Sequence, residues 1–396
     1  MHILRVAQDI FPETVGGAPY HIHALSRDQA AMGHEVTVLT VSDDVEERVV
    51  TDQNGYTLIK QPPRIELLGN QIFANTVRDL RGVENYDVVH THSHLFFSSN
   101  VAALYCRMAD IPVAITCHGL NSQRGPFWFS RAHLRTLGKW TYDSADVTLC
   151  YTDVEQSKLR DLGVDADIAV VNNGIDTSRF TPTGRDYPRI ANQSGQAIVF
   201  VGRLVDGKRP QDVLDAFDTI RDRCPDASLF FCGDGPLRDS LESTAADKGL
   251  TDAVEFLGRV PYQQMPSVFR AADLFVLPSR TEGFPRTVIE ALACETPVVA
   301  SNLEQTSEII NQTGETVQVG NAEGFATAIV DLLSDQHRLS ELGEHGREIV
   351  TTRYNWEETV RATTQILGQV AEIGDSVIQE KTESTSSPTP VIKDEL

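Results

Sequence analysis

Short apolar segments rich in Val, Ile and Leu alternate with longer helical segments along this chain, and no other feature limits its fold as strongly. Strands that alternate with helices form a parallel sheet covered on both faces. The alternation stops at a polar stretch that contains Pro182 and Pro188, and then begins again. The sequence therefore predicts two doubly wound α/β domains. The expected strands are His2–Ala7, Glu35–Val41, Asp87–His90, Val113–Cys117, Val147–Tyr151, Ile168–Val171, Ala197–Val201, Ser228–Cys232, Val254–Leu257, Leu274–Leu277 and Pro297–Ala300, with helices at Tyr20–Met32 and Leu95–Ala109.

The length of 396 residues agrees with two cores rather than one. We expect a Rossmann-like N-terminal domain over residues 1–180 and a Rossmann-like C-terminal domain over residues 196–352. Ligands of such sheets bind at the carboxyl ends of the strands, so the cleft between the domains is the expected site. Residues 375–396 are rich in Ser, Thr, Pro and Glu and are expected to be disordered. They end in Lys-Asp-Glu-Leu, a match to a retention signal of the endoplasmic reticulum that we interpret as coincidental.

The chain is strongly acidic, with 56 Asp and Glu against 34 Lys and Arg and a formal charge of −22. Only seven of the basic residues are Lys. A surface rich in carboxylates and poor in Lys suits a high-salt cytosol, where salt screens the self-repulsion. The charge also argues against nucleic acid as a partner, because nucleic-acid binding requires a basic face.

No apolar run approaches the ~20 residues that a membrane-spanning helix needs, and the first residues do not resemble a signal peptide. We therefore expect a cytoplasmic protein. The six cysteines show neither paired nor metal-ligand spacing, which predicts buried, reduced thiols. His90, His92 and His94 alternate along a strand and loop, but no carboxylate accompanies them, so we expect no metal site.

The strongest chemical signal is the segment Glu282–Glu290, which follows an apolar strand and runs into a helix. Its two carboxylates flank a glycine-containing turn, and the free backbone N–H groups of a helix start suit a phosphate. Glu282 lies before the turn and can accept hydrogen bonds from sugar hydroxyls. Glu290 lies two turns along and can reach a ribose diol.

A second signal combines a strand end with two cations, Arg203 and Lys208. Such fixed cations can neutralise a diphosphate without a metal. A departing nucleotide diphosphate gains charge as its glycosidic bond breaks, so these cations would stabilise the transition state more than the ground state. A solvated loop is the alternative, and it suits Arg209 better than Arg203, which directly follows Gly202.

Two weaker signals lie in the first half of the chain. The pair Gly16 and Gly17 follows the first strand and lets a backbone approach a ligand, although a plain turn explains it equally well. His118 ends a strand and could donate to a sugar hydroxyl or stabilise charge near an anomeric carbon. A single histidine in such a position also has a purely structural explanation.

Together these segments resemble the retaining glycosyltransferases of family 4, which have the GT-B fold of two Rossmann-like domains with an interdomain cleft. The resemblance runs from about residue 2 to 370, and its most specific element is the spacing of Glu282 and Glu290. The segment Tyr354–Trp356 is similar to the start of the last helix in that family, so we expect residues 353–372 to cross back to the N-terminal domain. The supporting matches are Gly16–Gly17, His118–Gly119, Asn173–Gly174, Gly202–Arg203, Lys208, Gly233–Pro236 and Pro297–Ser301.

The resemblance implies a role for each matching position. It implies that the transferred sugar keeps its anomeric configuration, and we assign no nucleophile. The implied donor is a UDP-sugar or a GDP-sugar, and no cofactor or metal is required. The implied catalytic residues are His118, Glu282, Arg203 and Lys208. The implied donor-binding residues are Gly16, Gly17, Arg203, Lys208, Gly233, Arg259, Glu282, Phe284, Pro285, Arg286, Thr287 and Glu290.

The sequence departs from the family pattern at two positions. Glu295 stands where glycine is usual, and Arg209 follows Lys208 where glycine is frequent. Neither change removes an implied ligand of the donor, so the expected site is retained.

One segment contradicts the acidic average. From Asn121 to Trp140 there are four basic residues, four aromatic residues and no acid. Such a stretch can rest on an anionic membrane surface or hold a phosphate-bearing acceptor, and a half-buried helix with solvated arginines explains it equally well. The expected acceptor is a glycan or a lipid-linked molecule, with peripheral contact at the inner membrane face. The residues assigned to this side are Arg124, Arg131, Arg135 and Lys139.

Alternative functions remain open at this point. A sugar-nucleotide epimerase could share the architecture, and a non-catalytic sugar-nucleotide-binding module could require the same carboxylates and cations. A dehydrogenase is disfavoured, because no G-x-G-x-x-G motif follows the first strand.

Overall fold

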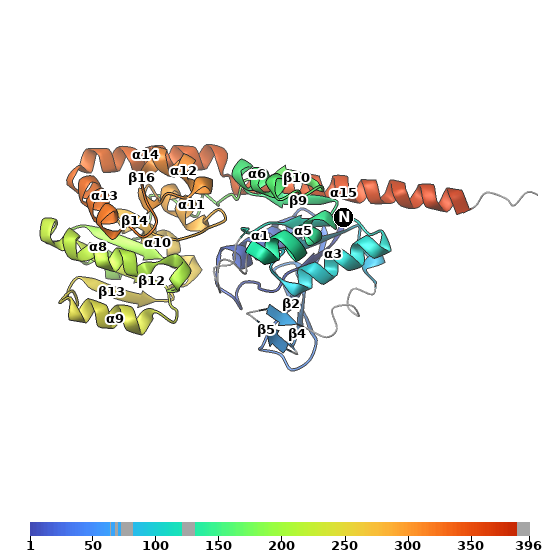
Figure 1. Ribbon diagram of the computed structural model, residues 1–396, viewed down its shortest axis with the longest axis horizontal. Helices are drawn as coiled ribbons and strands as arrows, with labels where there is room; N and C mark the ends of the chain where they lie inside the picture. Colours follow the sequence, from blue (N-terminus) through green and yellow to red (C-terminus); the bar gives the residue numbers. More distant parts are fainter. Residues whose placement is uncertain (64, 68–69, 73–81, 121–130, 386–396) are drawn as a thin grey trace, which may run out of the picture.

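The computed structural model describes residues 1–63, 65–67, 70–72, 82–120 and 131–385. They form two α/β domains, each built on its own sheet, as Figure 1 shows. The expected fold class is therefore confirmed.

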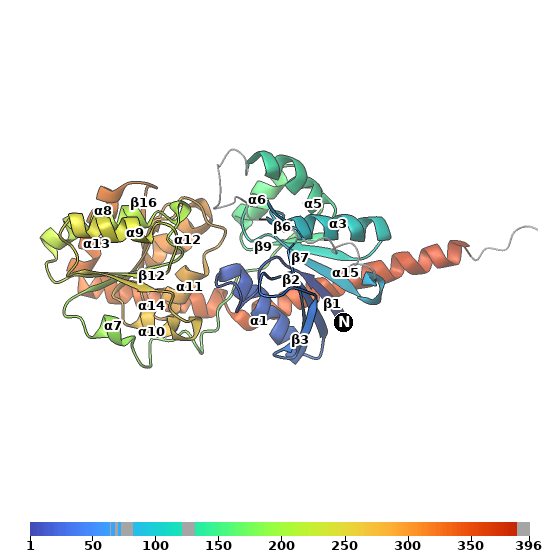
Figure 2. The ribbon, with the colours of Figure 1, turned by 90° about the horizontal axis from the view of Figure 1, so that it is seen from below.

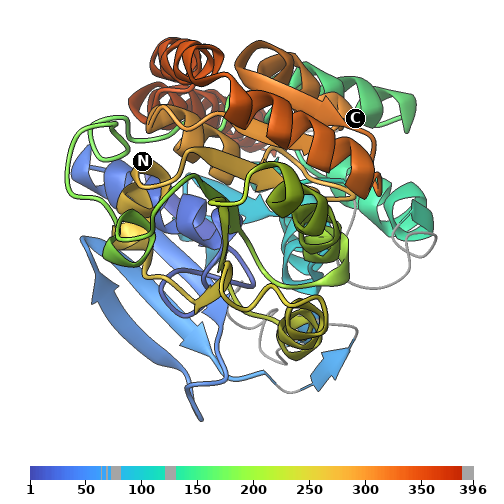
Figure 3. The same cartoon turned by 90° about the vertical axis from the view of Figure 1, so that its left-hand side faces the viewer.

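The N-terminal sheet has eight strands in the order β10-β9-β8-β7-β1-β2-β4-β3, and all neighbours are parallel except β3 and β4. Its central strands are buried on both faces, which explains their continuous apolar sequences. Figure 3 shows the antiparallel pair β3 and β4 as long blue arrows at one edge of the molecule. The strands are β1 (His2–Val6), β2 (Glu35–Val41), β3 (Val49–Gln53), β4 (Tyr56–Gln61), β7 (Val88–His92), β8 (Val113–Thr116), β9 (Val147–Cys150) and β10 (Asp167–Val170), with a separate hairpin of β5 (Ile65–Leu67) and β6 (Asn70–Ile72).

Helices cover both faces of this sheet. Side chains of α1 and α15 share one core cluster with the sheet, and side chains of α3, α5 and α6 share the other. The N-cap of helix α6 is Thr152, whose Oγ1 accepts from the backbone N–H of Glu155, while the Glu155 carboxylate accepts from the backbone N–H of Tyr151. The helical segments are α1 (Gly17–Ala31), α3 (Phe97–Ala109), α5 (Lys139–Asp143), α6 (Asp153–Asp161), η1 (Val83–Asn85) and the π-helical η2 (Leu134–Gly138).

The C-terminal sheet has six parallel strands in the order β13-β12-β11-β14-β15-β16. Helices α8, α9 and α13 pack on one face, and α10, α11, α12 and α14 pack on the other. Its strands are β11 (Ala197–Val201), β12 (Ser228–Cys232), β13 (Val254–Gly258), β14 (Leu274–Leu277), β15 (Val298–Ser301) and β16 (Gly314–Val317). Its helices are α7 (Pro188–Ala191), η3 (Asp206–Lys208), α8 (Pro210–Arg223), α9 (Arg238–Asp247), η4 (Tyr262–Gln264), α10 (Met265–Arg270), α11 (Arg286–Ala293), α12 (Glu304–Thr313), α13 (Ala322–Ser334) and α14 (Gln336–Arg353).

The chain crosses between the two domains twice, and the two crossing segments lie side by side. The backbone N–H of Ile175 donates to Tyr354 (2.8 Å), and that of Trp356 donates to Ile175 (3.2 Å). The second crossing leads into α15 (Trp356–Thr385), whose Leu367 and Val370 enter the N-terminal core. The last helix therefore returns to the N-terminal domain, as the resemblance implied.

Helix α15 is longer than the sequence suggested. It continues to Thr385 and projects past the N-terminal domain in Figures 1 and 2. Residues 375–385, which we expected to be disordered, are helical in the structure. Residues 386–396, with the terminal Lys-Asp-Glu-Leu, lie outside the described residues.

Candidate active site

The predicted site residues follow the carboxyl ends of parallel strands in both domains. Arg203 follows β11, Glu282 lies in the loop after β14, and His118 follows β8. This placement is the one expected for ligands of open α/β sheets. The remaining members are Gly16 and Gly17 after β1, Gly233 after β12, Arg259 after β13, and Phe284–Glu290 at the start of α11.

The two loops that carry the cations and the first carboxylate are tied together. Lys208 Nζ lies 2.5 Å from Glu282 Oε1, and these side chains are only 14% and 6% exposed. The backbone N–H of Arg280 donates to the carbonyl of Gly207 (2.9 Å), and its guanidinium lies 3.0 Å from the Asp206 carboxylate. A cation and a carboxylate assigned to the same donor therefore lie together.

Gly233 allows the loop after β12 to follow the loop that carries Arg203. The backbone N–H of Gly202 donates to Cys232 (3.0 Å), and a Cβ on Gly233 would lie 1.8 Å from the carbonyl oxygen of Gly202. No side chain fits there, so this glycine is required by the contact of two loops. Arg259 is 77% exposed and lies 3.8 Å from the Asp234 carboxylate at the rim of the same loops.

Glycines of the N-terminal domain touch the motif of the C-terminal domain. A Cβ on Gly119, whose φ is +120°, would lie 3.3 Å from the Cα of Gly283. A Cβ on Gly17 would lie 3.5 Å from Cδ of Arg286. The space beside Gly17 is thus bordered by an arginine of the other domain. At the periphery, Lys158 of α6 pairs with Glu304 of α12 (2.8 Å).

His118 lies in a row of hydrogen-bonded aromatic side chains. Its Nε2 is 2.9 Å from His92 Nδ1, and its Nδ1 is 2.7 Å from the hydroxyl of Tyr151. Desolvation by this packing lowers the pKa of His118 to about 3. A neutral imidazole whose two nitrogens have protein partners orients groups but supplies no positive charge.

Glu290 is buried and paired. The Tyr262 hydroxyl donates to Glu290 Oε1 (2.7 Å), and Arg286 Nε lies 3.7 Å from the same oxygen. Burial raises the pKa of Glu290, and Arg286, Tyr262 and Arg179 oppose this shift. Burial alone would lower the pKa of Arg286, but Tyr262 and Glu290 reverse the shift and raise it. The carboxylate predicted to hold a ribose is thus oriented by groups on two elements.

Arg286 also reaches the crossing between the domains. Its Nη1 donates to Asn173 Oδ1 and to the carbonyl of Gly174, each at 3.0 Å. His21 Nδ1 lies 3.0 Å from the same Asn173 oxygen. Because arginine only donates, that oxygen is an acceptor, so His21 Nδ1 carries the hydrogen. The side chain of Arg286, a residue predicted to line the donor pocket, is 5% exposed and contacts the interdomain crossing.

Several residues around Arg286 were not found from the sequence. The rings of Tyr20 and Tyr262, one from each domain, lie 4.0 Å apart. Arg179 donates to the Tyr20 hydroxyl (2.9 Å) and the Tyr262 carbonyl (2.6 Å), with its guanidinium 4.4 Å from the Tyr262 ring. The Trp356 ring lies 5.5 Å from the guanidinium of Arg286. No spacing in the sequence links these positions, since they come from four distant segments.

The rest of the motif is largely packed into the fold. Phe284 is 6% exposed and stacks on Tyr354, with ring centroids 5.1 Å apart. Pro285 is buried at the N-cap of α11, and Thr287 is half-buried in its first turn. This part of the motif can therefore offer a ligand mainly backbone groups.

The acceptor-side residues are only partly described. Arg124 lies outside the described residues. Arg131 and Arg135 are exposed, and Lys139 pairs with Asp143 one turn along α5. In Figure 2, α3 and α5 lie on the side of the N-terminal sheet opposite α15.

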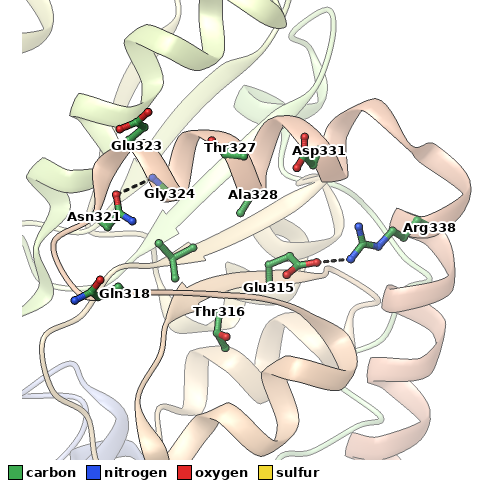
Figure 4. A pocket seen from close by; sticks show the side chains of 11 residues that line it. Glu315, Thr316, Gln318, Asn321, Glu323, Gly324, Thr327, Ala328, Asp331 and Arg338 are labelled. Atoms are coloured by element: carbon green, nitrogen blue, oxygen red, sulfur yellow. Dashed lines mark hydrogen bonds and ion pairs between the residues drawn. The ribbon is translucent and has the colours of Figure 1, made fainter.

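The described part of the chain contains no group of three or more His, Cys, Asp or Glu suited to a metal ion. His90 bonds to Thr116 and His94 bonds to Tyr142. A pocket of about 520 Å³ lies beside the edge strand β16, as Figure 4 shows. It contains none of the predicted site residues, and Arg338 and Glu315 are paired within it.

Two Rossmann-like domains and a returning C-terminal helix make up the GT-B fold. The model of the Glycosyltransferase Family 4 domain matches residues 15–179, and that of glycosyl transferases group 1 matches residues 189–349. This chain therefore belongs to glycosyltransferase family 4.

Three known proteins illustrate the relationship. The D-inositol 3-phosphate glycosyltransferase of Corynebacterium urealyticum is 31% identical over 71% of each chain. The GDP-mannose-dependent alpha-(1-6)-phosphatidylinositol monomannoside mannosyltransferase of Mycolicibacterium smegmatis is 26% identical over 89% of this chain and 95% of its own. The structure of sucrose-phosphate synthase from Thermosynechococcus elongatus superimposes with a TM-score of 0.79 at 22% identity, covering 93% of this chain and 98% of that one. Within the described residues, no helix is both long and apolar enough to cross a membrane.

Proposed function

We propose that this glycosyltransferase transfers a hexose-type sugar from a UDP-sugar or GDP-sugar, with retention at the anomeric carbon and without a metal. The observation that carries the proposal is the pair of Lys208 and Glu282 beside Arg203, at strand ends that meet the His118–Gly119 turn of the other domain. A donor placed there would have its sugar at Glu282 and its diphosphate at the two cations. Family membership favours this function over an epimerase or a binding module.

The charges explain how the donor would be cleaved. Breaking the glycosidic bond leaves an additional negative charge on the departing diphosphate, and Arg203 and Lys208 would stabilise it. In the free protein Lys208 is neutralised by Glu282. A bound diphosphate would compete for Lys208 and release the Glu282 carboxylate toward the sugar hydroxyls. Binding of the donor would therefore also position the Glu282 carboxylate.

The acceptor is proposed to be a lipid-linked or phosphate-bearing molecule. One relative is named for an inositol phosphate and another for a phosphatidylinositol monomannoside. In this chain, Arg131 and Arg135 are exposed on the domain that carries His118. Their guanidinium groups suit a phosphate on either kind of acceptor. We propose a cytoplasmic protein that works at the inner membrane face.

A thermal-shift screen tests the donor assignment. UDP-, GDP- and ADP-sugars would be added with and without EDTA, and a ligand at ~100 times its Kd adds about 2.7 kcal/mol of stability. We expect a UDP- or GDP-sugar to raise the Tm equally with and without chelator. Arg203→Ala and Glu290→Ala should abolish the shift. Arg209→Ala is the matched control, because Arg209 lies in the same loop but pairs with Asp212.

Turnover separates the proposal from its alternatives. A glycosyltransferase slowly hydrolyses its donor in the absence of acceptor, an epimerase releases an isomeric sugar, and a binding module leaves the donor intact. Hydrolysis that stops on addition of EDTA would contradict the metal-free mechanism.

A further inference from the structure

Helix α3 has an unusual distribution of side chains. Its inward face carries small and polar residues, including the buried Ser98, Ser99 and Asn100. Val101 and Tyr105 pack against the core, but three other large apolar residues, Phe97, Leu104 and Met108, are 38%, 38% and 76% exposed. These three positions, spaced i, i+7 and i+11, form one stripe along the helix. Burial in the domain core therefore does not explain them.

A second apolar surface lies beside this stripe. Leu137 of η2 is 41% exposed and Trp140 of α5 is 39% exposed. Helices α3 and α5 are joined by a hydrogen bond from Asn100 Nδ2 to Thr141 Oγ1 (2.8 Å). Among the described residues, five of the eight exposed large hydrophobic side chains come from these two segments. We call the five, Phe97, Leu104, Met108, Leu137 and Trp140, the α3–α5 face.

The charge of the same segments is opposite to that of the chain. Residues 97–109 and 131–143 carry four basic side chains and one acidic side chain, Asp143, which pairs with Lys139, in a chain with 56 acidic and 34 basic residues. Arg131 and Arg135 are exposed. An apolar stripe flanked by arginines fits a surface that offers both hydrocarbon and phosphate.

We propose that the α3–α5 face docks on an anionic lipid bilayer, with its apolar side chains in the headgroup boundary and Arg131 and Arg135 on lipid phosphates. Trp140 combines a large apolar ring with one polar N–H, as is typical of side chains at a membrane interface. A two-fold contact between copies of this chain would bring the same arginines together, which like-charge repulsion opposes. The proposal rests on the proposed function only in that docking would bring the enzyme to a lipid-linked acceptor.

Vesicle co-sedimentation without donor or acceptor tests the docking. The full chain should bind vesicles of phosphatidylcholine with ~30% phosphatidylglycerol, bind pure phosphatidylcholine more weakly, and lose affinity as salt rises. Leu104→Asp with Met108→Asp should weaken binding by about tenfold or more. Met32→Asp is the matched control, because Met32 is 53% exposed at the end of α1, away from this face. Arg131→Glu with Arg135→Glu should remove the preference for anionic vesicles.

Two further measurements keep the result unambiguous. Each variant should keep the wild-type Tm and the wild-type thermal shift with nucleotide sugar, which excludes misfolding. Trp140 emission should shift to the blue on vesicles, and Trp140→Phe should remove that change.

The proposal is overturned if no vesicle is bound at any salt concentration, or if the α3 variants bind as the Met32 variant does. It is also overturned if the α3 variants only dissolve a dimer. Vesicle binding without a nucleotide-sugar shift would refute the proposed function and leave the docking surface intact.

Discussion

Arg286 connects the predicted ribose carboxylate to both domains. It pairs with Glu290 on its own helix and donates to Asn173 and Gly174 on the crossing that leaves the N-terminal domain. The guanidinium group can serve both sides because it offers five donors in a fixed plane. The position of Glu290 therefore depends on how the two domains meet.

Replacing Arg286 with methionine should affect stability and donor binding separately. Arg286→Met leaves the buried Glu290 carboxylate without its cation, which should lower the free energy of unfolding by about 3–5 kcal/mol. Adding Glu290→Gln removes the isolated charge, so the double variant should regain part of this loss in urea titrations. Neither variant should show a nucleotide-sugar thermal shift. A double variant no more stable than Arg286→Met would contradict this account.

Buried histidines should make the protein sensitive to acid. Burial lowers the pKa of His94 to about 3, below the ~6.5 expected in the unfolded chain. Between these values the unfolded state binds the proton and the folded state does not, so stability falls as the pH drops. The contribution of one such histidine is about 1.4 kcal/mol per pH unit.

Urea unfolding at pH 7.5, 6.5 and 5.5 measures this effect. His94→Gln should be less stable than wild type at pH 7.5, because it alters the contact with Tyr142, but its stability should fall less steeply with acid. Equal slopes for the two proteins would refute the assignment to His94.

At the scale of elements, close contact between the loops after β11 and β12 sets the geometry of the cation site. Gly233→Ala would force a Cβ against the Gly202 carbonyl, so the loop that carries Arg203 must move. We expect a weaker nucleotide-sugar shift together with a loss of about 1–3 kcal/mol of stability, as for other overpacked sites. Gly249→Ala is the control, because Gly249 has a φ of +70° but open space around it. It should lose about 1 kcal/mol and keep the full shift.

The sequence identified the central strands but missed the peripheral ones. All eleven expected strands are present, with ends shifted by two residues at most. Buried parallel strands are continuous apolar runs, which makes them visible in a sequence. In contrast, β3 and β16 lie at sheet edges and expose part of their length, so their sequences Val-Val-Thr-Asp-Gln and Gly-Glu-Thr-Val lack such a run. Helix α3 was expected, but not its outward-facing apolar stripe.

At the scale of the whole molecule, Trp356 anchors the returning helix. Its Nε1–H donates to Asp28 of α1 (2.6 Å), and its ring packs on Ala24 and Leu25. Trp356→Ala should lower the free energy of unfolding by about 3–5 kcal/mol. Calorimetry should show a lower Tm and separation of the melting of the two domains. Trp140→Ala, at an exposed tryptophan, should change the Tm little. A single unchanged transition in Trp356→Ala would show that α15 does not couple the domains.

The net charge of −22 gives a prediction for the entire chain. Screening of repulsion between carboxylates should raise the free energy of unfolding between ~0.1 M and ~2 M KCl. Denaturant titrations at these two concentrations measure it, and equal stability at both would argue against adaptation to a salt-rich cytosol.

The sequence by itself determined the two-domain α/β architecture and the strand ends that carry Arg203, Glu282 and His118. This was possible because a buried strand or a glycine turn is encoded by residues that are contiguous in the chain. Only the tertiary structure decided that Lys208 pairs with Glu282 and that Glu290 and Arg286 are held by Tyr262 and Asn173. These partners come from segments far apart in the chain, and whether two side chains meet depends on how the sheets, crossings and domains pack. The local sequence pattern gives no information about the distance between such side chains in the folded protein.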